Sequence, residues 1–112
     1  MEQILRRKDI ILVPFLFSNQ LESKRRPALI VSNDNFNERS LDIIACAITS
    51  NIDQDDSVYI KSEDWKDGLY SESCVKVANV FTLEKKIVLK RIGRLGSDRF
   101  NEVVQKLKEI IS

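Results

Sequence analysis

Short apolar runs, each ending in polar or turn-forming residues, recur along most of this chain. The runs cover residues 9–13, 27–32, 41–48, 57–60, 73–77 and 87–92. Runs of about four to eight residues that are rich in β-branched side chains and bounded by polar clusters are typical of β-strands. The pattern therefore predicts a mainly β protein over most of its length.

The final segment of the chain has a different period. Its apolar side chains recur at the spacing of an amphipathic helix, and they are Phe100, Val103, Val104, Leu107, Ile110 and Ile111. Ser97 is the predicted N-cap of this helix. Several short strands followed by one such helix predict a small, strongly bent antiparallel barrel that a C-terminal α-helix closes.

Three segments carry further structural signals. Residues 33–37 are rich in Asn and Asp, so they predict a turn, and the runs on either side predict an antiparallel hairpin. Residues 62–66 predict a helical turn capped by Ser62. The run 41–48 is largely apolar on both faces, which predicts burial on both sides, by the core or by a partner.

The candidate chemistry lies at one end of the predicted hairpin. Three cations, the last of them Arg26, directly precede Pro27, and a proline is expected at the first position of a strand because it has no N–H to donate. Folding the chain about the middle of residues 33–40 brings Arg26 close to Thr49, where opposed Cβ atoms lie about 5 Å apart. Read alone, the cationic stretch indicates only a basic turn. The predicted pairing of the two strands places the hydroxyl groups of Thr49 and Ser50 close to the guanidinium of Arg26.

Composition and charge narrow the class of protein. The chain has 112 residues, of which 43% are hydrophobic and 31% charged, and its formal net charge is +1. These values are ordinary for a soluble globular protein, and residues 1–112 are expected to form a single domain. Basic and acidic residues cluster apart. Such clusters permit a cationic groove for a polyanion, although they are more often solvated faces.

The cysteines and the lack of histidine exclude some chemistry. Cys46 and Cys74 lie in apolar runs, where a thiol acts as a small buried hydrophobe. Without histidine or a Cys-x-x-Cys spacing, a zinc site built from Cys and His is close to excluded, and no metal or cofactor is expected. A reducing cytoplasm is the expected location. No run approaches the roughly 18 apolar residues of a membrane span.

Five stretches, in order, resemble the MazF/PemK/Kid toxins, which are the ribonuclease halves of toxin–antitoxin modules. Residues 24–32 together with 47–50 resemble the most characteristic pair of motifs in that family. The other matching stretches are residues 9–15, Gly68-Leu69 with Ser73, Thr82-Leu83 and residues 92–95. Each stretch is weakly specific alone, whereas their order over nearly the whole chain is specific.

The resemblance implies an SH3-like barrel of the CcdB/MazF type, usually a homodimer, with an acidic antitoxin as its protein partner. It also implies a metal-independent endoribonuclease that needs no cofactor and acts on single-stranded RNA such as mRNA. The expected reaction is attack by the adjacent 2′-hydroxyl. This attack leaves a 2′,3′-cyclic phosphate and a 5′-hydroxyl.

The catalytic role falls on three residues that match the family motifs. A guanidinium can contact two phosphate oxygens at once, so Arg26 is expected to stabilise charge on the phosphorane. Thr49 and Ser50 are expected to donate hydrogen bonds to the same phosphate, and donors of this kind are each worth roughly 10²–10³ in rate. A mobile loop over the site is predicted at residues 18–25. The residues expected to contact RNA are Lys24, Arg25, Glu22 and Lys76.

Two departures from the family pattern bear on function. Many members have an acidic residue followed by Gln where this chain has Ala78-Asn79, so the general base proposed for that branch is missing. Lys8 replaces the Gly that normally precedes Asp9, which affects a turn more than the chemistry. The identity of the base and the RNA recognition motif therefore stay open.

Two other function classes compete with the ribonuclease. A gyrase poison like CcdB shares the fold but relies on a Trp-Gly-Ile end, whereas this chain ends in Ile110-Ile111-Ser112. A non-catalytic SH3-like module lines a peptide groove with aromatic side chains. This chain is only 7% aromatic, and Trp65 is its one tryptophan. The ribonuclease is the leading interpretation.

Overall fold

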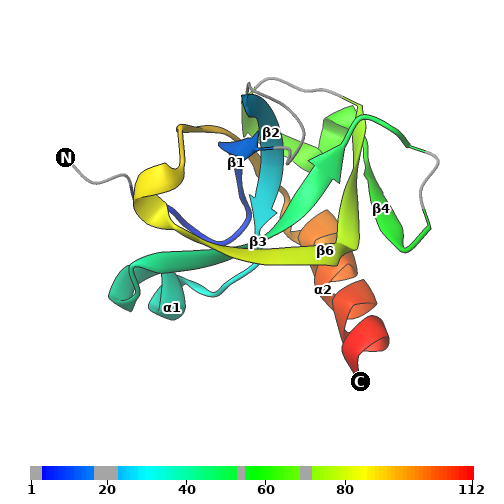
Figure 1. Ribbon diagram of the computed structural model, residues 1–112. Coiled ribbons are helices and arrows are strands. Elements are labelled where there is room, and N and C mark those ends of the chain that lie inside the picture. Colours follow the sequence, from blue (N-terminus) through cyan, green and yellow to red (C-terminus); the bar gives the residue numbers. More distant parts are fainter. Residues whose placement is uncertain (1–3, 17–22, 53–54, 69–71) are drawn as a thin grey trace.

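The computed structural model describes residues 4–16, 23–52, 55–68 and 72–112, and within them seven antiparallel strands form one curled sheet (Figure 1). The strands are β1 (Asp9–Leu16), β2 (Ser23–Ile30), β3 (Asp42–Thr49), β4 (Ser57–Ile60), β5 (Trp65–Gly68), β6 (Ser73–Glu84) and β7 (Lys90–Leu95). The helical elements are α1 (Asp34–Arg39), α2 (Ser97–Ile111) and the 3₁₀ turns η1 (Ser62–Asp64) and η2 (Lys85–Ile87). The order across the sheet is β4-β6-β3-β2-β1-β7-β5. The predicted mainly β fold with a C-terminal helix is confirmed.

Neighbouring residues along β1, β2 and β3 pack into two different cores. Ile10 and Cys46 belong to a core that α2 covers with Phe100. Ile11 and Ala45 belong to a second core, on the other side of the sheet, because side chains alternate across a strand. The predicted burial of the third run on both of its faces is therefore confirmed for β3.

Helix α2 covers one side of the sheet near β4 and β6, and its last turns extend beyond the strands (Figure 1). Phe100 and Val103 are its fully buried residues and Val104 and Leu107 are partly buried, as the helical spacing predicts, whereas Ile110 and Ile111 of the predicted face are exposed. The predicted cap is wrong: Gly96 is the N-cap, and Ser97 is the first helical residue. The N–H of Gly96 donates to the carbonyl of Asp64 at 2.7 Å, which holds the chain extended up to that point.

Strands β1 and β2 form a hairpin in which both strands are longer than their predicted ranges. Its ladder continues to the pair Leu16 and Ser23, so β1 extends past residue 13 and residues 23–25 are strand, not loop. Pro27 therefore lies inside β2, and the prediction that it begins a strand is wrong. Strand β2 pairs with β3 only from Ala28 onward. Pro27 is tolerated because up to that point β2 has β1 alone as its neighbour.

The connection between β2 and β3 is more ordered than the predicted turn. It contains α1, whose N-cap Asn33 accepts a hydrogen bond from the N–H of Phe36 at 2.8 Å. The side chains of Ser32 and Asn37 are buried and bonded to each other, and Ser32 Oγ also accepts from the N–H of Ile44 at 3.0 Å. These bonds fix the register of β3 against β2.

The later elements differ from prediction mainly at their ends. Strand β4 matches its predicted range, whereas β6 is longer and η2 occupies the start of the last predicted strand. The helical turn η1 follows Lys61, whose N–H donates to the carboxylate of Asp64 at 2.8 Å, so the predicted capping role of Ser62 is wrong. Strand β5 was not predicted. It pairs with β7 and includes Lys66, which was assigned to the helical turn.

Lys8 occupies the turn before β1 with a φ of 79°. This left-handed conformation is the one that glycine adopts without strain, which explains why a Lys-for-Gly replacement there concerns the turn. Within the described residues, no helix is long and apolar enough to cross a membrane.

Candidate active site

The middle of β2 and the end of β3 meet at one pocket. Ala28 pairs with Ala47 in antiparallel register, so continuing the ladder by two residues places Arg26 opposite Thr49. Arg26, Thr49 and Ser50 all line a pocket of about 230 Å³. The structure thus brings together the three residues to which the catalytic role was assigned.

Arg26 holds its position through the backbone of β2. It pairs with Val13 on β1, and the proline that follows restricts it to an extended conformation. Its side chain is exposed. A guanidinium on such a fixed backbone can present two parallel N–H donors to a phosphate.

The hydroxyl groups lie where β3 ends. Thr49 is the last residue of β3 and pairs with Cys74 on β6. Its Oγ1 accepts a hydrogen bond from the N–H of Asn51 at 3.1 Å, which orients the side chain. A hydroxyl that accepts still has its own proton to donate. Ser50 follows directly and is exposed, so two O–H groups stand beside the guanidinium.

The rest of the pocket is largely apolar, and prediction from the sequence did not include it in the site. Its other lining residues are Pro27, Ile48, Trp65, Ser73 and Ile92. Trp65 reaches the pocket from β5, beside Gly93 on β7: a Cβ built on Gly93 would lie 2.4 Å from the indole ring. The one signal in the sequence was Gly93 itself, because glycine inside a strand often marks a close approach; its pairing with Gly68 is seen only in the structure.

The predicted RNA-contacting residues have different surroundings. Arg25 is exposed and its backbone pairs with Pro14, while the backbone of Lys24 pairs with Phe15. Lys76 is half-buried in β6, between β3 and β4. Arg25 and Lys76 are not among the residues that line the pocket. Glu22 lies outside the described residues, as does the rest of the predicted loop at 18–22.

No acidic side chain or imidazole lines the pocket among the described residues. Ala78 and Asn79 are exposed and lie where the ladder between β3 and β6 shifts, since Cys46 pairs with Val80 but Ala47 pairs with Lys76. The missing acid is therefore not replaced from β6. The described residues also contain no cluster of three or more His, Cys, Asp or Glu side chains that could hold a metal.

The two cysteines are structural. Both are buried, as predicted, and both are free thiols. Burial raises the pKa of the Cys46 thiol to about 11, so it stays protonated at neutral pH and is not a nucleophile.

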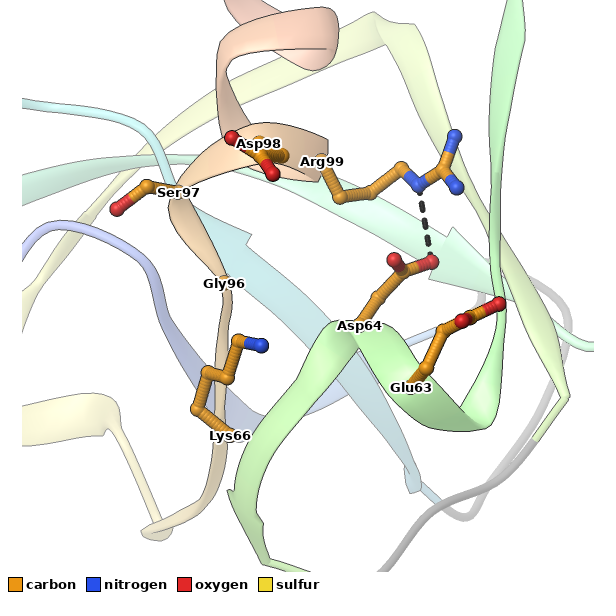
Figure 2. Close-up of a pocket in the computed structure, with 7 residues that line it drawn as sticks. All are labelled: Glu63, Asp64, Lys66, Gly96, Ser97, Asp98 and Arg99. Carbon is orange, nitrogen blue, oxygen red and sulfur yellow. Dashed lines mark hydrogen bonds and ion pairs between the residues drawn. The ribbon is translucent and has the colours of Figure 1, made fainter.

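A larger pocket of about 620 Å³ lies between η1 and the start of α2 (Figure 2). It is lined by Glu63, Asp64, Lys66, Gly96, Ser97, Asp98 and Arg99. The Nε of Arg99 lies 2.9 Å from Asp64, and its Nη1 lies 2.5 Å from Glu102. The hydrogen bond to Asp64 raises the pKa of Arg99 above its ordinary value. The pair of Arg99 with Asp64 joins η1 to α2, whereas the pair with Glu102 lies within α2, so the larger pocket is a structural junction.

One protein-family model matches nearly the whole chain. It is described as the PemK-like, MazF-like toxin of the type II toxin–antitoxin system, and it matches residues 6–111. No curated protein gives a significant match to the chain.

Solved structures share the fold at low sequence identity. An endoribonuclease from a mycobacterial species is 21% identical with a TM-score of 0.75, over 96% of this chain and 91% of that one. The MazE–MazF structure from Deinococcus radiodurans is 20% identical with a TM-score of 0.81, over 97% of each chain. The Mycobacterium tuberculosis toxin MazF-mt6 is 20% identical with a TM-score of 0.69, over 90% of this chain and 93% of that one. The predicted fold type is confirmed by these matches.

Proposed function

Because the chain belongs to the PemK-like, MazF-like toxins of type II toxin–antitoxin systems, we propose that it is an endoribonuclease whose active site is the pocket where β3 ends beside the middle of β2. The observation that carries this proposal is the convergence of Arg26, Thr49 and Ser50 on that one pocket. A bidentate cation beside two hydroxyl donors is suited to a phosphate that gains charge during reaction.

The proposed step is an internal transfer at phosphorus. The 2′-oxygen of one nucleotide attacks the adjacent phosphate, a bond from phosphorus to the 2′-oxygen forms, and the bond to the 5′-oxygen breaks. The products are a 2′,3′-cyclic phosphate and a 5′-hydroxyl, which takes up a proton. Arg26 contacts two phosphate oxygens while Thr49 and Ser50 donate to the developing charge.

The proton of the 2′-hydroxyl leaves to solvent in this proposal. The described residues that line the pocket include no carboxylate, imidazole or thiol, and a guanidinium is a poor base. Catalysis therefore comes from positioning and from electrostatic stabilisation, and the latter accounts for most of the rate enhancement of many enzymes. No metal is needed for this route, and the lining residues that the structure describes offer no carboxylate to bind Mg²⁺.

Single-stranded RNA such as mRNA is the proposed substrate, and the cytoplasm is the proposed site of action. Exposed Arg25, beside Arg26, adds positive charge that attracts phosphate without reading sequence. The protein partners proposed are a second copy of the chain and an acidic antitoxin. The endoribonuclease from a mycobacterial species that was solved with its cognate antitoxin supports the latter.

The test is to incubate the purified protein with a long RNA of mixed sequence in excess chelator. Discrete cuts with cyclic-phosphate and 5′-hydroxyl ends are expected. Activity that appears only when Mg²⁺ is restored would reject the metal-independent route. Intact RNA under all conditions, with a protein shown to be folded, would reject the ribonuclease.

A further inference from the structure

Half of the candidate active site is not explained by phosphate chemistry. Arg26, Thr49 and Ser50 account for the polar side of the pocket, but Trp65 and Ile92 add apolar surface to it. A phosphate gains nothing from an apolar wall. The pocket therefore has room for a second, uncharged part of the ligand beside the phosphate.

The fold makes specific provision for the indole of Trp65. Trp65 is the first residue of β5 and pairs with Leu95 on β7. A Cβ on Gly93 would lie 2.4 Å from the ring, closer than such contacts occur, so only glycine at this position leaves the indole where it is. Trp65 is half-buried and packs against the core that α2 covers, which keeps the ring in a fixed place.

We propose that Trp65 is a stacking surface for one nucleobase of the RNA, next to the phosphate that Arg26 holds. This inference rests on the proposed function, since it takes RNA as the ligand. Single-stranded RNA is commonly bound by stacking its splayed bases on aromatic side chains. The volume of about 230 Å³ is below the roughly 300–1,000 Å³ of pockets for drug-sized molecules, so it suits one ring system. Trp65 thus positions the substrate and does not take part in the bond changes.

The chain offers a direct reporter of this contact, because Trp65 is its only tryptophan. A 2′-O-methyl RNA oligonucleotide of mixed sequence binds without being cleaved, since the attacking hydroxyl is blocked. Titration with it should change the tryptophan fluorescence in a saturable way. A fully abasic backbone of the same length keeps the phosphates, and it should bind more weakly and leave the fluorescence almost unchanged. Binding of both is followed independently by the anisotropy of a labelled strand.

The second experiment tests whether the Trp65 side chain matters for binding only when the oligonucleotide carries bases. Trp65→Leu should weaken binding of the base-containing oligonucleotide roughly 5- to 100-fold, as expected for loss of one stacked base, and leave the abasic backbone unaffected. Trp65→Phe keeps an aromatic ring and should recover most of the loss. A purely structural role for Trp65 predicts instead that Trp65→Leu weakens both oligonucleotides equally, in step with a lower melting temperature.

The inference is overturned by equal losses for the two oligonucleotides. It is also overturned if the tryptophan fluorescence is unchanged at saturating oligonucleotide. A fluorescence change with an acidic peptide but not with the oligonucleotide would overturn it too, because the apolar wall would then bind a protein partner. The result of this binding test does not depend on whether the protein cleaves RNA. Base-dependent coupling in a protein that leaves RNA intact would retain the base subsite and reject the enzyme. Cleavage of RNA without base-dependent coupling would retain the enzyme and reject the base subsite.

Discussion

Two pockets of the protein differ in the charges that line them as well as in their volume. The pocket between η1 and α2 is the larger, at about 620 Å³ against 230 Å³, and it is lined by three acids and two bases. Among the described residues, the pocket where β3 ends beside the middle of β2 has one charged lining residue, the cation Arg26. A polyanion is attracted by an excess of positive charge, which only the smaller pocket has. Charge balance, not volume, thus distinguishes the candidate active site.

The physical reason for the difference is what each set of charges does in the fold. In the larger pocket the side chains of Arg99 and Asp64 are only 22% and 12% exposed and bond to each other. They fasten η1 to the start of α2. Arg26 instead stands where β2 has not yet paired with β3, and its side chain is exposed. The smaller pocket can therefore serve a ligand.

The largest effect is expected from Arg26→Ala. It removes the bidentate donor, so we expect cleavage to fall by more than about 10³-fold while the melting temperature is nearly unchanged, because exposed substitutions change stability by roughly 0.5 kcal/mol or less. Rates under single-turnover conditions and thermal unfolding give the two values. Near-normal cleavage by this variant would remove Arg26 from the active site.

The next largest effect is expected from Thr49→Val, which keeps the β-branched shape and removes the hydroxyl. Loss of one donor should slow cleavage roughly 10²-fold. Thr49→Ser is the matched control, because it retains the hydroxyl and should stay within a few-fold of the original rate. If both variants are equally slow, the methyl group and packing matter, not the donor.

The register that unites these residues could be predicted from the sequence because its signals are local. An Asn-rich break between two apolar runs is enough to indicate a hairpin, and Ala28 does pair with Ala47. The convergence of Arg26 with Thr49 then follows by counting residues. An error of one or two residues at the ends does not alter this, as the misplaced start of β2 at Pro27 shows.

The apolar half of the pocket could not be predicted in this way. The segment Trp65–Gly68 has no alternation of apolar and polar residues, and it becomes a strand only by pairing with β7, far along the chain. The prediction of Ser97 as the N-cap of α2 was wrong for a similar reason, because a hydrogen bond from the N–H of Gly96 to the carbonyl of Asp64 fixes the start of the helix. Long-range pairing decides both features, and a local pattern does not contain it.

A third variant tests the larger pocket, between η1 and α2. Arg99→Ala removes the partner of Asp64 and Glu102, so we expect the free energy of unfolding to fall by about 1–2 kcal/mol, between the values for exposed and buried pairs. Denaturant unfolding measures it. Cleavage per folded molecule should stay unchanged. A loss of activity as large as that of Arg26→Ala would place chemistry in the larger pocket.

The smallest effect is expected from Arg25→Ala. Arg25 is exposed and does not line the pocket, so its loss should weaken RNA binding only several-fold. The plot of log affinity against log salt should become shallower by about one unit, as for one lost phosphate contact. Titrations at several salt concentrations check this. An unchanged slope together with slow cleavage would assign Arg25 to the reaction itself.

The claim that the smaller pocket is the active site is tested most directly by Arg26→Lys. The variant keeps the positive charge and loses the planar fork that contacts two phosphate oxygens. The single-turnover cleavage rate, with RNA affinity and melting temperature measured on the same preparation, separates the possible roles. We predict that cleavage falls by about 10² or more, while affinity changes only a few-fold and the melting temperature stays the same. Cleavage close to the original rate would contradict the account and reduce Arg26 to a point charge.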